Sequence, residues 1–97
     1  MKRVEPESIG DVLRRTIEEQ NMTSRLRETR AIELWPRIVG PHIAACASRP
    51  VVKNRIMTIG IPAAPLRHDL MMSRSQIIDI INQTLKAEVI ADIRFTS

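Results

Sequence analysis

The stretch Arg49–Ile61 reads Arg-Pro-Val-Val-Lys-Asn-Arg-Ile-Met-Thr-Ile-Gly-Ile, and here the pattern of the chain changes from helical to strand-like. Two short runs rich in Val, Ile and Thr, residues that favour strands, flank the pair Asn54-Arg55. Asn tolerates the positive φ of a tight turn, so this pair is a candidate two-residue turn. The stretch therefore predicts a β-hairpin over about 50–62, which Pro62 ends.

Helical periodicity precedes the hairpin. A stripe spaced for one helix face follows Ser8, a credible N-cap, and predicts a first helix over about 8–21. The stripe consists of Ile9, Val12, Leu13 and Ile17. Residues 1–7 are polar and are expected to form a short flexible segment.

A second helix is expected to begin near Thr23-Ser24. Pro36 lacks a backbone donor, so it is expected to interrupt this helix and to open a short new one. Gly40 precedes Pro41 and is expected to stop the helix, because glycine permits positive φ there. Residues 43–47 predict one or two further helical turns.

Beyond the hairpin, apolar spacing predicts a long helix over about 65–84, and Val89–Phe95 alternates like a half-buried strand. The expected order is α-α-β-β-α-β. The economical packing is an α+β two-layer domain over 8–97, with a three-stranded sheet covered by helices on one face.

Composition limits the possible functions. The chain has 97 residues with 43% hydrophobic and 27% charged residues, which is typical of one globular domain. Trp35 and Phe95 are the only aromatics, so a base-stacking surface is excluded as the main binding mechanism. The formal charge of +4 comes mostly from arginine and favours anionic partners, phosphate above all.

Several classes of site are excluded. Cys46 alone cannot form an internal disulfide, and one cysteine with His42 and His68 lacks the spacing of a closed zinc site. No serine or cysteine lies in a nucleophile motif, so we expect no enzyme, no cofactor and no small-molecule substrate. There is no signal peptide and no apolar run long enough for a membrane, which predicts a cytoplasmic protein.

Six cations are the candidates for nucleic-acid contact. Guanidinium groups match phosphate oxygens, and such contacts give salt-sensitive affinity that is independent of base sequence. A solvated helix face is the alternative. Four of the candidates lie within thirteen residues and two flank the hairpin turn: Arg25, Arg27, Arg30, Arg37, Lys53 and Arg55. Trp35 is either a core residue or a partner contact, and Gly40 is either structural or part of a partner-contact motif.

The stretch Trp35–Ala44, which reads Trp-Pro-Arg-Ile-Val-Gly-Pro-His-Ile-Ala, carries a family resemblance together with the hairpin and the closing Ile93-Arg94-Phe95. It is similar to the domain-of-unknown-function family 721 (DUF 721), whose best understood members are the DciA proteins of bacterial replication. The resemblance covers about 8–96. The chain departs from it at Leu66, where many members have a second Trp, and it matches the bare domain without the basic extension of longer members.

The resemblance implies a KH-like fold, a role as loader or operator of the replicative helicase, and affinity for DNA. No Gly-x-x-Gly loop occurs in the chain, so the RNA-gripping mechanism of KH domains does not transfer. The expected function is a non-enzymatic replication accessory domain that contacts the helicase and binds DNA weakly through its backbone. The alternatives are an RNA- or ribosome-associated KH-like adaptor and a pure protein-interaction module.

Overall fold

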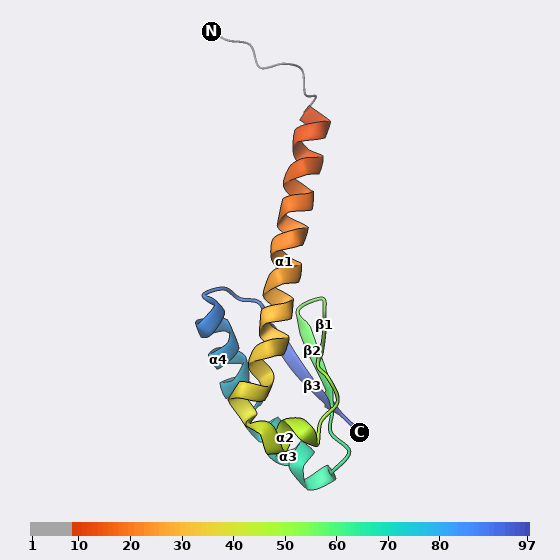
Figure 1. Cartoon of the computed structure of the whole chain (residues 1–97), viewed down its shortest axis with the longest axis vertical. Helices are drawn as coiled ribbons and strands as arrows, with labels where there is room; N and C mark the ends of the chain where they lie inside the picture. The colour runs from red at the N-terminus through yellow and green to blue at the C-terminus, as the bar shows by residue number, and fades with distance from the viewer. Residues whose placement is uncertain (1–8) are drawn as a thin grey trace.

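The computed structural model describes residues 9–97, so the predicted flexible segment 1–7 and the predicted cap Ser8 lie outside the described residues. The α+β class and the three-stranded sheet are confirmed (Figure 1). The KH-like comparison stays a prediction. The elements in chain order are α1 (Ile9–Val39), α2 (Pro41–Ala45), β1 (Val51–Lys53), β2 (Ile56–Gly60), α3 (Ala64–Met72), α4 (Arg74–Leu85) and β3 (Asp92–Thr96).

Helix α1 is a single helix of 31 residues, so the predicted end near residue 21 and the predicted interruption at Pro36 are wrong. The polar residues between the predicted first and second helices are compatible with one continuous helix. The hydroxyls of Thr23 and Thr29 donate to the carbonyls of Glu19 and Arg25 at 3.0 Å, so they stay inside the helical pattern. Pro36 lies in the last turn, where its missing N–H removes only one intrahelical hydrogen bond.

Gly40 ends α1, as the sequence predicts. Its φ of 91° and ψ of 162° lie in a region that is accessible almost only to glycine. The Gly40 N–H still donates to the Pro36 carbonyl at 2.9 Å, while the Gly40 carbonyl accepts from Ala44 N–H at 3.0 Å. This residue therefore redirects the chain from α1 into α2 without breaking backbone hydrogen bonding.

The sheet has the order β1-β2-β3, with β1 antiparallel to β2 and β3 parallel to β2. Asn54 and Arg55 both have positive φ, 53° and 65°, which confirms the predicted two-residue turn. Met57 and Ile93 are paired and buried, whereas Thr58 lies on the opposite face of β2. The helices cover one face of the sheet, as expected, and the core lies between the two layers.

The predicted long helix over 65–84 is two helices, α3 and α4, that meet at Ser73. Ser73 has φ −98° and ψ 6°, which is outside the helical region. A straight helix of this length would extend about 30 Å, well past the short strands. The bend instead lets both α3 and α4 contact β3 and places Leu70 and Ile77 in the same core.

Asn82 anchors the connection from α4 to β3. Its side-chain oxygen accepts from the N–H groups of Val89 and Ile90 at 3.0 Å each, and its amide nitrogen donates to the Ile90 carbonyl at 2.9 Å. Both of these loop residues are buried, so Asn82 supplies hydrogen bonds that water cannot. No helix within residues 9–97 is both long enough and apolar enough to cross a membrane.

Asn82→Ala leaves the buried N–H and carbonyl of Ile90 without their side-chain partner, while the Val89 N–H keeps its second acceptor, the Ala87 carbonyl at 2.9 Å. We expect it to lower the free energy of unfolding by about 2–4 kcal/mol. Denaturant unfolding followed by circular dichroism measures the change. Gln83→Ala, at the exposed neighbouring position, is the matched control and should change stability by only about 0.5 kcal/mol or less. Equal effects of the two substitutions would contradict the anchoring role.

Gly40→Ala should lower the free energy of unfolding by about 1–3 kcal/mol, because alanine must adopt the unfavourable backbone conformation of this position. No atom lies within 4 Å of a Cβ built at Gly40, so the cost is conformational rather than steric. Gly10→Ala, inside α1, is the control and should leave stability unchanged or raised. A neutral Gly40→Ala would show that the backbone can relax.

Candidate nucleic-acid interface

Arg30 and Arg37 lie together on one side of α1. They are seven residues apart, about two helical turns, which places both guanidinium groups on the same face. With Glu33, Leu34 and Leu85 they line a hollow of about 180 Å³ between α1 and α4. Continuity of α1 through Pro36 produces this pairing.

Arg27 and Arg55 form a second pair, where the hairpin turn approaches α1. They line a hollow of about 130 Å³ that also contains Glu28 and Glu88. Arg55 is already committed: its Nη2 donates to the Glu88 carbonyl at 3.0 Å and lies 3.7 Å from Glu88 Oε2. Arg27 has no ion pair or side-chain hydrogen bond to any residue within 9–97.

The remaining two candidates lie apart from these pairs. Arg25 lies with Met22 and Leu26 on another side of α1, where the three line a separate hollow. Lys53 is opposite Ile56, and its side chain lies on the face of the sheet away from the helices. The six predicted cations are therefore all exposed but do not form one patch.

Hydrogen bonds and ion pairs distinguish the arginines that already have a partner from those that have none among the described residues. Arg67 donates to the Ile61 carbonyl at 2.8 Å, and Arg74 lies 3.6 Å from Asp92 Oδ1. Arg27, Arg30 and Arg37 are exposed, lie toward one side of α1, and have no side-chain partner in the part of the chain that the structure describes. We call these three residues the arginine flank.

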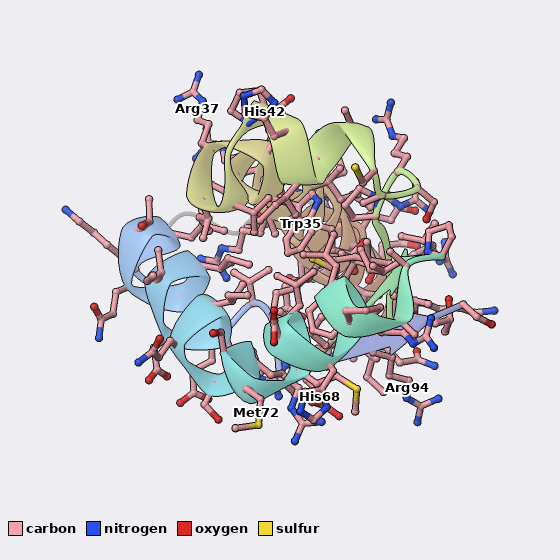
Figure 2. All side chains as sticks on the ribbon, turned by 90° about the horizontal axis from the view of Figure 1, so that it is seen from below. Trp35, Arg37, His42, His68, Met72 and Arg94 are labelled. Atoms are coloured by element: carbon pink, nitrogen blue, oxygen red, sulfur yellow. The ribbon has the colours of Figure 1, made fainter. Side chains whose placement is uncertain are left out.

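Sequence reasoning missed two arginines that the fold leaves exposed, Arg49 and Arg94. Figure 2 shows Arg37 and His42 pointing outward on the same side of the domain, and Arg94 pointing outward elsewhere. Arg94 lies on the open face of the sheet, as Lys53 does. Lys53 pairs with Ile56 of β2, Ile56 pairs with Asp92 of β3, and Arg94 is two positions beyond Asp92. Arg49 lies at the edge of the hollow beside Trp35. Only the three-dimensional pairing of elements identifies these positions.

Trp35 is a core residue, with 1% of its surface exposed. Its ring lies 6.0 Å from that of Phe95 at a tilt of 43°, which joins α1 to β3. The indole Nε1 is buried and has no hydrogen-bond acceptor among the described residues. An unpartnered buried donor costs about 1–3 kcal/mol, so this tryptophan carries an unmet polar requirement.

One edge of Trp35 borders a depression of about 450 Å³ between α1, the end of α2 and the segment that leads into β1. We call this depression the apolar hollow. Its apolar part includes Pro36, Ala44 and Ala47, and its polar part includes Glu33 and Arg49. The mixture of apolar surface and opposite charges suits a protein segment better than a nucleic-acid backbone. Gly40 and Pro41 set the position of α2, and therefore the shape of this hollow.

The structure does not bring the two histidines together. Figure 2 shows His42 and His68 on opposite sides of the domain. Within residues 9–97 no group of three His, Cys, Asp or Glu side chains could hold a metal ion. Cys46 is exposed, and its thiol is free.

Comparison with known proteins adds the family. The family described as "Dna[CI] antecedent, DciA" matches residues 8–95. The search of curated proteins finds no match. The family match covers nearly every residue of the fold described above, including Trp35, Gly40 and the arginine flank. The chain therefore belongs to the DciA family, a family of DNA-replication accessory proteins related to the loading of the replicative helicase.

Proposed function

We propose that the domain contacts the replicative helicase and binds DNA weakly through the phosphate backbone, in the bacterial cytoplasm and without catalysis. Family membership supports the replication role. The observation that supports the DNA contact is the arginine flank, in which three exposed guanidinium groups on one side of α1 have no partner among residues 9–97.

Unpartnered arginines are the ones available to phosphate. A guanidinium that already pairs with a carboxylate, as Arg55 does with Glu88, must break that pair before it binds DNA. Arg30 and Arg37 border a hollow with Leu85 and only one acid, Glu33. Two to three phosphate contacts give low affinity that falls steeply with salt and does not depend on base sequence.

The helicase contact is assigned to the apolar hollow beside Trp35. This depression combines apolar lining with opposite charges at its edge, and three successive segments of the chain form it. An apolar side chain of the partner would bury against Pro36 and Ala47, with Arg49 placed to bind an acidic neighbour. Glu33 lines both the apolar hollow and the hollow beside Arg30 and Arg37, so the two proposed contact surfaces adjoin each other.

Arg30→Ala with Arg37→Ala should weaken binding to single-stranded DNA and reduce the slope of log K against log salt by about 1.4, because two phosphate contacts are lost. Fluorescence anisotropy over a salt series measures both quantities. Arg74→Ala is the matched control, since this arginine is exposed but paired with Asp92. It should leave the slope unchanged.

The same titration separates the alternatives. Salt-dependent binding to single-stranded DNA that requires the arginine flank supports the proposal. Binding to RNA of equal length that is at least about tenfold tighter than binding to DNA would instead favour the RNA-associated adaptor. No binding to either nucleic acid at low salt would favour a module that binds only protein.

Arg49→Glu should weaken binding to purified replicative helicase by about 1–2 kcal/mol, or five- to thirtyfold in the dissociation constant, by reversing the charge at the edge of the apolar hollow. Biolayer interferometry with immobilised domain measures it. Arg94→Glu makes the same charge change on the open face of the sheet and is the control. If both variants bind helicase equally well, the contact lies elsewhere.

A further inference from the structure

The N-terminal part of α1 stands outside the domain. Figure 1 shows the helix extending well beyond the sheet and the other helices. We call residues 9–22 the arm. It carries large apolar side chains in solvent: Ile9 is 79% exposed, Leu13 57% and Ile17 55%. Few helices in a soluble protein leave such a stripe uncovered.

The exposed stripe continues the core-facing side of the same helix. Leu13 precedes Ala31 by eighteen residues, and Ile17 precedes Trp35 by eighteen residues, which is about five helical turns. Ala31 and Trp35 are both buried in the core. The arm therefore extends the buried face of α1 beyond the point where the described domain covers it.

The charges on the arm argue against nucleic acid and lipid as its occupant. Arg14 and Arg15 are offset by three acids, Asp11, Glu18 and Glu19, and the arm has no aromatic side chain. A phosphate backbone or an anionic membrane surface would meet as much repulsion as attraction. A helix with its own apolar face and balanced charge fits better.

The spacing of the stripe points to a second copy of the arm. Ile9, Leu13 and Ile17 form an i, i+4, i+8 ridge, and the commonest helix packing interlocks two ridges of this same type. The ridge has Leu13 at its centre, with one isoleucine four residues away on each side. An antiparallel copy therefore places Leu13 against Leu13 and Ile9 against Ile17.

A parallel copy is excluded by the position of the domain. The sheet, α3 and α4 lie on the same face of α1 as the ridge, from Ala31 onward. Two parallel helices joined through that face would bring both domains into the same space. An antiparallel pair puts the domains at opposite ends. We propose that the arm forms an antiparallel homodimer contact centred on Leu13.

Sedimentation equilibrium of the full chain tests the contact. We expect a monomer–dimer equilibrium, and Leu13→Glu should raise the dimer dissociation constant by about tenfold or more, because it buries a charge at the centre. Met22→Glu is the matched control: Met22 is 69% exposed on the same arm but lies off the ridge. It should leave the dimer unchanged. Leu13 does not pack in the core, so both variants should fold, and circular dichroism checks this.

Oxidative cross-linking tests the orientation. In a Cys46→Ser background, Leu13→Cys should form a disulfide-linked dimer, since the antiparallel pair juxtaposes the two copies of that position. Ile9→Cys alone should not cross-link, whereas an equal mixture of the Ile9→Cys and Ile17→Cys variants should. Efficient cross-linking of Ile9→Cys alone would overturn the antiparallel arrangement.

Three results would overturn the proposal as a whole. One is a chain that remains monomeric at about 0.5 mM, far above any useful affinity for this contact. Another is a dimer that Leu13→Glu leaves intact. The third is a dimer that Met22→Glu weakens as much as Leu13→Glu does. A monomeric chain whose helicase binding is lost in Leu13→Glu would assign the arm to the helicase instead.

Discussion

The burial of one face of α1 against the sheet is the contact on which the other elements depend. Ala31 and Trp35 are almost inaccessible, and Trp35 reaches Phe95 on the last strand. Because β3 pairs with β2 and β2 pairs with β1, this contact connects the start of the domain to every strand. With only two aromatics in the chain, aliphatic side chains must fill the rest of the core.

The elements that depend on local chemistry could be predicted from the sequence. Asn54-Arg55 specifies its turn, Gly40 specifies the end of α1, and alternation specifies β3. The continuity of α1 could not be predicted, because polar residues between two stripes and a proline near the end are equally compatible with two helices. The break at Ser73 was also hidden, since it follows from the short sheet rather than from the residues around it.

The candidate site shows a similar division. Sequence identified the cations, and helix periodicity relates Arg30 to Arg37. Which arginines are available depends on tertiary contacts: Arg55 meets Glu88 across thirty-three residues, and Arg74 meets Asp92 across the connection to β3. Sequence order alone grouped Lys53 and Arg55, yet Lys53 ends β1 on the open face of the sheet, whereas Arg55 lies in the turn and meets Glu88.

The parallel pairing of β2 and β3 also has a consequence for how the chain folds during synthesis. Ile93 belongs to the core, but its partner strand precedes it by a crossover that contains α3 and α4. Until Thr96 has left the ribosome, the nascent chain can form α1 and the hairpin but cannot close the sheet. During that interval Ile93 and Phe95 are missing from the core, so the growing chain presents the uncovered side of Trp35 and the hairpin to chaperones before the domain is complete.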